Sequence, residues 1–524
     1  MSTAAVQSTS SAAPTRMISM DELKKHNKPG DAWVSINGDV YDVSKFAKLH
    51  PGGELILMEH VGGDVTEVFY SYHMHEVIQK QQRLKIGRLE GAKEVHIVDS
   101  SEISNVPFAE PSYWLGWKSM YYNETHKKFR VDVRKLLDSC REEAEAGEAN
   151  GKAPSEELYH LLGSEGFLAA RIGPSGLKHI EKLPGGLPKE KFDYFHEGIC
   201  HEEVAHLATP GFLAGMGEGM VIGLPPVLQF GKPWMKERVG KEVLSGQKRI
   251  CLAITEPNAG SDVANLLTTA VKTPDGKHYI VNGAKKWITG GCQSQYFTTA
   301  VRTGGKGAKG VSMLLIERGE GVETKSIQTS YSKAAGTAYI TFENAKVPVD
   351  NVIGMENMGF MCIMYNFNHE RWFIVCYVLS ATRGAIEQAV KWCHQRKAFG
   401  KRLIDQPVVR QKIAHSIAEL EAVQNWYENI TYQMTQLPYE QQSVKLGGAV
   451  SLLKLQATRV AHRVSDEVVQ VFGGRSLTKT GMGRIVERFK NTYKFAAILG
   501  GSEEIMADLG LKLAMKNYPK NAKL

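Results

Sequence analysis

Three groups of residues in this sequence have side chains and spacings that could do chemistry. His50 is followed by Pro51-Gly52-Gly53, a tight turn that fixes the direction of an imidazole, the commonest metal ligand in proteins. Glu370 stands among aromatic residues, where partial desolvation would raise the pKa of its carboxyl toward that of a useful base. Gly500-Gly501-Ser502 is a glycine-rich turn before a predicted helix, a natural cradle for an anion or another ligand.

The composition is that of an ordinary globular protein with more than one domain. The 524 residues are too many for one core, with 43% hydrophobic and 23% charged residues. The net charge of +8 comes without a dense basic run and interleaved aromatics, which disfavours a nucleic-acid partner. A basic surface equally suits a negatively charged small substrate. The seven scattered cysteines form no Cys-x-x-Cys pair, which indicates a reducing compartment.

The pattern along the chain predicts the parts that must position these groups. An Asn37-Gly38 turn between two short apolar runs predicts a β-hairpin near the start. We expect a lead-in at 1–16, a small α+β module at 17–92, a linker at 93–114, a helical domain at 115–248, a β domain at 249–352, a helical bundle at 353–515 and a tail at 516–524.

Two features bear on where the protein resides. The longest apolar run, Trp372–Ala381, is too short to span a bilayer, and no signal peptide pattern opens the chain, so we expect no membrane span. The final Ala522-Lys523-Leu524 is similar to the peroxisomal address Ser-Lys-Leu. We therefore expect a peroxisomal protein, with the mitochondrion or the cytoplasm as alternatives.

The block at 17–92 resembles cytochrome b5. The matching residues are Trp33, Gly38 to Val43, Phe46, His50-Pro51-Gly52-Gly53, Gly62-Gly63-Asp64, Thr66 and Phe69. The resemblance implies a haem b whose iron is held by two imidazoles, one from each side. His50 would be one ligand. His73, four residues after Phe69, is the expected second ligand, and His75 is the alternative.

Residues 115–515 resemble an acyl-CoA dehydrogenase along their whole length. Five segments carry the resemblance in the family order: Leu252 to Asp262, Lys286 to Thr289, Arg396 to Gln406, Gln470 to Gly474, and Gly500 to Ile505. The fold implied is a helical domain, a middle β domain and a C-terminal four-helix bundle. The family binds FAD and forms homotetramers or homodimers with FAD at the subunit interface.

The resemblance assigns FAD and substrate contacts to particular residues. The implied FAD contacts are Leu252, Ile254, Thr255, Ser261, Trp287, Thr289, Arg396, Phe399, Gln406, Gln470, Gly474, Ser502 and Glu504. An arginine such as Arg396 suits a pyrophosphate, because its planar fork binds two oxygens at once. The spacing to Gln406 is one residue shorter than the common form. The implied substrate contacts are Ser261, Arg371 and Gly500.

The base for the α-proton is the point where the chain departs from most of the family. Most members place a glutamate where this chain has Gly500. A minority, including long-chain and isovaleryl types, supplies it from another helix, and Glu370 matches that position beside Arg371. A position near Phe367, Trp372 and Phe373 would desolvate this carboxylate. Glu503 and Glu504 are the remaining carboxylates nearby, and the family gives neither of them this role.

The resemblances imply an FAD-dependent dehydrogenase that converts a fatty acyl-CoA to trans-2-enoyl-CoA, with the fused haem as an electron acceptor. An acyl-CoA oxidase that passes electrons to oxygen is the first alternative. A non-catalytic flavin-fold scaffold or nucleic-acid binder with a haem sensor is the second. The acyl chain length and the physiological acceptor stay open at this point.

Overall fold

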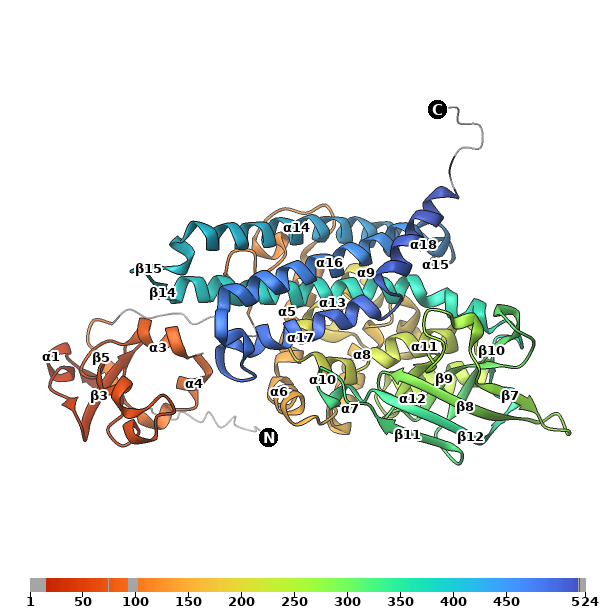
Figure 1. The fold of residues 1–524 in the computed structure, drawn as a ribbon, viewed down its shortest axis with the longest axis horizontal. Helices are drawn as coiled ribbons and strands as arrows, with labels where there is room; N and C mark the ends of the chain where they lie inside the picture. The colour runs from red at the N-terminus through yellow and green to blue at the C-terminus, as the bar shows by residue number, and fades with distance from the viewer. Residues whose placement is uncertain (1–15, 74, 93–101, 517, 519–524) are drawn as a thin grey trace, which may run out of the picture. The chain divides into compact units, whose positions relative to one another are not determined.

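The computed structural model describes residues 16–73, 75–92, 102–516 and 518, and the chain divides into two compact units (Figure 1). One unit holds the chain before position 100 together with Lys391–Gln406 and Thr480–Gly483, and the other holds the rest. The C-terminal tripeptide expected to be an address signal lies outside the described residues, as does the lead-in up to residue 15.

The first unit is built on a five-stranded sheet with the order β1-β5-β4-β3-β2. Its strands are β1 (Met17–Ile18), β2 (Asn27–Lys28), β3 (Asp31–Ile36), β4 (Asp39–Asp42) and β5 (Lys85–Leu89). Asn37 and Gly38 join β3 to β4 with φ values of 54° and 80°, so the predicted hairpin forms through a turn with two left-handed residues. Short helices cover the sheet: α1 (Met20–Leu23), α2 (Glu54–Met58), α3 (Thr66–Tyr72) and α4 (His75–Gln79).

The second unit begins with helices that pack through buried charges as well as apolar residues. These helices are α5 (Glu124–Asp138), α6 (Arg141–Asn150), α7 (Glu156–Ser164), α8 (Phe167–Ala170), α9 (Tyr194–His206), α10 (Pro210–Gly215), α11 (Glu218–Phe230) and α12 (Gly240–Leu244). Arg130 on α5 bonds Glu202 on α9 at 2.6 Å and Glu110 at 2.9 Å. Glu110 belongs to the segment expected to be a linker, and its buried ion pairs show that this part packs into the helical layer.

One stretch, Pro210–Phe230, is long and apolar enough to cross a membrane by composition. Its most apolar 18-residue window is completely buried in the second unit, as expected for a core helix. Its burial indicates part of the protein core rather than a membrane span.

A β domain follows these helices. Its strands are β6 (Ile250–Ala253), β7 (Thr269–Lys272), β8 (His278–Ile288), β9 (Tyr296–Arg302), β10 (Val311–Glu317), β11 (Val322–Ser326), β12 (Ala338–Pro348) and β13 (Val352–Ile353). They run in the order β11-β12-β8-β7-β9-β10-β13, and β6 pairs with β9. Apolar side chains on these strands form one buried cluster. Helix α11 packs on β6, so the core helix supports the strand that leads into the predicted flavin loop.

Long helices complete the second unit (Figure 1). They are α13 (Gly359–Gln395), α14 (Pro407–Gln436), α15 (Tyr439–Lys445), α16 (Gly447–Phe472), α17 (Arg484–Ile498) and α18 (Glu503–Met515). Helix α16 packs against α14, α17 and α18. Trp372 fastens α13 to α14, because its indole N–H donates to Thr431 Oγ1 at 2.9 Å and its ring stacks on Tyr427. A two-stranded hairpin, β14 (Lys397–Ala398) with β15 (Lys401–Arg402), follows α13.

Candidate active site

Glu370 is a buried carboxylate on α13 with the properties of a general base. Only 4% of the residue is exposed, and its Oε2 has no hydrogen-bond partner among the described residues. Burial raises the pKa of Glu370 to about 7, although the nearby cations of Arg371 and Lys454 favour the ionised form. A carboxyl with a pKa near neutrality can be ionised before the reaction and still hold a proton afterwards.

The turn before α18 lies directly beside this carboxylate. Gly500 and Gly501 have φ values of 64° and 105°, conformations that glycine adopts without strain. A Cβ built on Gly500 would lie 3.4 Å from Glu370 Oε1 and 2.7 Å from Ile374 Cδ1. The position that carries glutamate in most of the resembled family therefore borders Glu370. Ser502 then caps α18 by accepting a bond from the Ile505 N–H.

Two cations hold this turn from two helices. Arg371 Nε on α13 donates to the Gly500 carbonyl at 3.2 Å, and Lys454 Nζ on α16 donates to the Gly501 carbonyl at 2.6 Å. Lys454 is buried, and this burial lowers its pKa to about 7 while Glu370 opposes the shift. Sequence reasoning missed Lys454. The available signal was a single lysine between leucines in Leu452-Leu453-Lys454-Leu455.

His369, beside the candidate base, belongs to a separate buried network. Its Nε2 lies 2.6 Å from Glu197 Oε1, and His201 Nε2 lies 3.5 Å from the same oxygen. Burial raises the pKa of Glu197, but the two histidines lower it overall. This network joins α13 to α9, which indicates a structural role for His369.

The predicted flavin loop is held in place by one carboxylate and one strand. The Lys286 N–H on β8 donates to the Thr255 carbonyl at 2.8 Å. Glu256 accepts bonds from the N–H groups of Leu267 and Thr268 at 2.5 and 2.9 Å. It also pairs with the buried Lys285 at 2.7 Å, so the loop has one defined path.

The loop and the end of β8 present one exposed aromatic ring next to buried polar residues, a surface on which a flavin ring could lie. Trp287 has a φ of 65° and is 52% exposed, whereas Thr289 two residues later is buried. A flat ring system laid on Trp287 would cover its exposed surface, so these residues fit the isoalloxazine of FAD. The other predicted contacts here are Ile254, which is buried, Leu252 and Thr255, which are half-buried, and Ser261, which is exposed.

The remaining predicted FAD contacts are exposed or half-buried, and Arg396, Gln406 and Ser502 are the half-buried ones. Phe399 is 98% exposed at the tip of the β14–β15 hairpin with a φ of 52°. Gln406 Nε2 donates to the Ala398 carbonyl at 3.4 Å, and Arg396 precedes the hairpin. Gln470, Gly474 and Glu504 are also exposed. Such exposure suits contacts with the FAD of a second subunit, and these assignments stay predictions.

In the first unit, His50 and His73 face each other. Their ring centroids lie 5.8 Å apart. His50 Nδ1 bonds the Gly53 carbonyl at 3.1 Å and His73 Nδ1 bonds the Phe69 carbonyl at 3.2 Å. A ring whose Nδ1–H donates to a carbonyl uses Nε2 for a metal. Both histidines therefore fit a haem iron.

Two further observations bear on the haem site. Leu49 and Leu55 beside His50 are about three-quarters exposed, at 74% and 76%, and offer apolar surface to a porphyrin. The side chain of His75, the alternative ligand, lies outside the described residues. His73 as the second ligand stays a prediction that the ring geometry supports.

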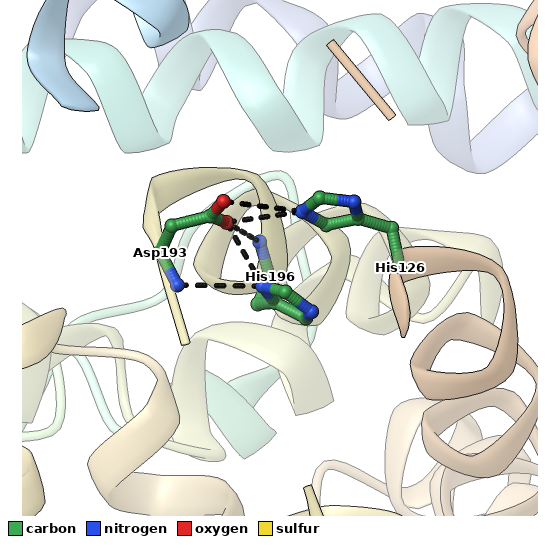
Figure 2. A group of neighbouring side chains, drawn as sticks. All are labelled: His126, Asp193 and His196. Atoms are coloured by element: carbon green, nitrogen blue, oxygen red, sulfur yellow. Dashed lines mark hydrogen bonds and ion pairs between the residues drawn. The ribbon is translucent and has the colours of Figure 1, made fainter. Parts of the chain in front are cut away.

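A third titratable cluster, His126, Asp193 and His196, has the spacing of a metal site, but its atoms serve as helix caps (Figure 2). His126 Nδ1 accepts from the Asn123 N–H at 3.0 Å, and its Nε2 lies 3.1 Å from Asp193 Oδ1. His196 Nδ1 lies 2.9 Å from the same oxygen, and its Nε2 contacts Thr125 Oγ1. Every ring nitrogen and carboxylate oxygen of the group has a partner. The cluster therefore ties the first turns of α5 and α9 together.

Comparison with protein families agrees with this division of the chain. A cytochrome b5-like heme/steroid binding domain matches residues 19–90. The middle domain of acyl-CoA dehydrogenase matches residues 251–345, and the C-terminal domain matches residues 357–514. The predicted order of a small α+β module, helices, a β domain and a helical bundle is confirmed.

Individual relatives cover most of the dehydrogenase part. Acyl-CoA dehydrogenase apdG of Emericella nidulans is 39% identical over 430 residues, which are 81% of this chain and 98% of the relative. Cyclohexane-1-carbonyl-CoA dehydrogenase of Geobacter metallireducens is 30% identical over 391 residues, 73% of this chain and 96% of the relative.

Solved structures show the same fold. A putative acyl-CoA dehydrogenase from Mycobacterium smegmatis has a TM-score of 0.66 and 27% identity, covering 76% of this chain and 100% of that one. Butyryl-CoA dehydrogenase from Megasphaera elsdenii has a TM-score of 0.67 and 24% identity with the same coverage.

Proposed function

Because the chain belongs to the acyl-CoA dehydrogenase family and carries a cytochrome b5-like domain before the dehydrogenase part, we propose that it converts a fatty acyl-CoA to trans-2-enoyl-CoA. The observation that carries this proposal is the buried Glu370 carboxylate beside the Gly500 turn. The candidate base lies beside the turn whose backbone would bind the thioester carbonyl, and removal of the α-proton requires both groups close to the same carbon.

The cofactors are FAD, which when bound accepts a hydride, and haem b, which when bound carries single electrons. Trp287, Thr289 and the Thr255 loop would hold the flavin ring. His50 and His73 would hold the haem iron.

The chain's own residues divide the work at the reacting carbons. The ionised Glu370 takes the α-proton, so the Cα–H bond breaks and its electron pair becomes part of the new Cα=Cβ bond. The β-hydrogen departs with its own electron pair. A backbone N–H at the Gly500 turn would polarise the thioester carbonyl and so lower the pKa of the α-proton. Arg371 and Lys454 hold this turn through its two carbonyls, so the donor and the base keep a constant separation.

The fused haem domain is our proposed electron acceptor. A one-electron carrier in the same polypeptide receives the electrons that a flavin releases singly. We also propose a peroxisomal location from Ala522-Lys523-Leu524. The exposed Phe399 and the half-buried Arg396 support a homotetramer or homodimer. A peroxisomal setting favours oxygen as a competing acceptor, which would make the protein an acyl-CoA oxidase.

Product analysis tests the proposal and separates the two acceptors. The purified protein would be incubated in air with saturated acyl-CoAs of increasing length and an excess of cytochrome c, a one-electron acceptor that can reoxidise the haem. Enoyl-CoA, reduced cytochrome c and hydrogen peroxide would be measured together. We expect enoyl-CoA with much less than one peroxide for each turnover. One peroxide for each enoyl-CoA would identify an oxidase, and no enoyl-CoA from any substrate would contradict the proposed reaction.

A further inference from the structure

A second buried carboxylate lies at the start of the core helix α11. Glu218 is the only charged residue between Pro210 and Gly231. It is 2% exposed, and its Oε2 has no hydrogen-bond partner among the described residues. Burial raises the pKa of Glu218 to about 7, against the influence of Arg171. The proposed reaction uses neither residue, and a buried carboxylate without a partner is costly to keep.

Arg171 stands near Glu218 without pairing with it. The arginine is 1% exposed, and its Nη1 donates to the Met216 carbonyl at 3.1 Å. Its Nε has no partner within the described part of the chain. Glu218 is nevertheless the charge that most favours the protonated form of Arg171. Glu218 Oε2 is therefore an unused acceptor and Arg171 Nε an unused donor in the same buried region, and the two side chains form no ion pair with each other.

This neighbourhood borders the predicted flavin strand. A Cβ built on Gly219, the residue after Glu218, would lie 2.9 Å from the Thr289 carbonyl oxygen. Thr289 is one of the residues that would hold the flavin ring. The start of α11 therefore lies against the end of β8, at the backbone of one proposed flavin contact.

It also borders the catalytic helix. Tyr377 lies seven residues after Glu370 on α13, so both occupy one face, about 10 Å apart along the axis. The Tyr377 hydroxyl is buried and has no partner among the described residues, although its ring keeps some exposed surface. After burial, Glu218 is the neighbour that most raises the pKa of Tyr377, ahead of Tyr331 and Glu370. Glu218 therefore lies near Tyr377, which shares a face of α13 with Glu370.

We propose, on the basis of the proposed function, that Glu218, Arg171 and Tyr377 bind a hydroxyl group on the acyl chain of the substrate, about 10 Å from the carbons that react. A hydroxyl both donates and accepts, so it can bond the carboxylate and the guanidinium at once. A substrate carboxylate would be repelled by Glu218. A purely apolar chain end would leave three buried polar atoms unpaired. The substrate class is therefore a hydroxylated acyl-CoA.

Matched substrates test this assignment. Steady-state enoyl-CoA formation would be measured with octanoyl-CoA, 8-hydroxyoctanoyl-CoA and 4-hydroxyoctanoyl-CoA, with an excess of cytochrome c as the one-electron acceptor. We expect the 8-hydroxy compound to exceed octanoyl-CoA about tenfold in kcat/KM, because a site built to bond a hydroxyl discriminates against its absence. We expect the 4-hydroxy compound, whose hydroxyl falls short of Glu218, to be the poorest of the three.

Two variants and one control locate the effect. Tyr377→Phe and Glu218→Gln should reduce the preference for the 8-hydroxy compound to about twofold or less. Tyr427→Phe removes a buried hydroxyl that accepts a bond from Cys376 Sγ on another face of α13 and keeps the ring that stacks on Trp372, so it should keep the preference. Equal kcat/KM values in the wild-type protein would mean that water alone satisfies these groups and would overturn the hydroxyl assignment only. Failure of every acyl-CoA to give enoyl-CoA would overturn the proposed function as well.

Discussion

Glu370 and Gly500 are neighbours: a Cβ on Gly500 would lie 3.4 Å from Glu370 Oε1, although the two residues are far apart in the sequence. A glutamate at position 500 would project beside the existing carboxylate, and two ionised carboxylates at that spacing would each raise the pKa of the other. The glycine at position 500 therefore leaves Glu370 as the single carboxylate beside this turn.

Replacing this base should stop the chemistry and leave the fold. Glu370→Gln keeps the size and burial of the side chain, but a neutral amide cannot take the α-proton. We expect the rate of flavin reduction by acyl-CoA to fall by roughly 10²–10⁴-fold or more, with FAD content unchanged. Glu428→Gln is the matched control, because Glu428 on α14 is half-buried and desolvation also raises its pKa to about 7. Full flavin bleaching in Glu370→Gln would exclude Glu370 as the base.

The rate of flavin reduction should depend on pH through the ionisation of Glu370. Burial raises the pKa of this carboxyl to about 7, and only the ionised form can accept a proton. The rate should therefore fall about tenfold for each pH unit below 7 and level off above it. A rate that stays constant from pH 5.5 to 8.5 would contradict this assignment.

The Lys454→Met variant tests how far the charge of Lys454 lowers the pKa of Glu370. Arg371, Lys454 and His369 are the neighbours that favour the ionised form of Glu370. Removal of the Lys454 charge should raise the pKa of Glu370 and move the rising limb of the pH profile to higher pH. Lys454→Arg should restore much of the wild-type profile, because it keeps the charge. A limb that does not move in Lys454→Met would show that the lysine only supports the Gly501 turn.

Substitution of the histidines should define the haem ligands. His50→Ala and His73→Ala each remove one imidazole from the facing pair, so both variants should lose the absorption spectrum of a haem iron with two histidine ligands. His75→Ala should keep that spectrum and serves as the control. The opposite result, in which His75→Ala loses the spectrum and His73→Ala keeps it, would assign the second ligand to His75.

The Asp193 cluster should behave as a structural cap. The Asp193 carboxylate accepts bonds from the N–H groups of Phe195 and His196 and contacts the His126 ring. Asp193→Ala should destabilise the protein by about 1–2 kcal/mol in chemical denaturation. Asp508→Ala, which removes an exposed carboxylate, should change stability by less than about 0.5 kcal/mol. A large rise in stability on adding zinc to the wild-type protein would show instead that the cluster binds metal.

Local rules predict part of this structure well. The Asn37-Gly38 hairpin forms as expected because its turn depends on two residues that tolerate positive φ. The order of helices and strands follows from periodicities that the chain displays over long stretches.

The site could be predicted only through resemblance, because its parts meet by tertiary packing. No local pattern brings Glu370 beside Gly500 or places Lys454 of α16 on the Gly501 carbonyl. Sequence patterns also do not predict the buried ion pairs of Glu110 with Arg130 and Arg134, because charged residues lie mostly on protein surfaces. Glu218 carried a usable signal, a lone charge in an apolar stretch.

Anaerobic rapid mixing of the holoprotein with an acyl-CoA tests the central claim most directly. Flavin absorbance and the haem bands would be followed in the same reaction. We predict that the flavin bleaches first and that the bands of reduced haem then appear, without any added acceptor. Flavin bleaching with an unchanged haem spectrum would contradict internal electron transfer, and an unchanged flavin would contradict the dehydrogenation itself.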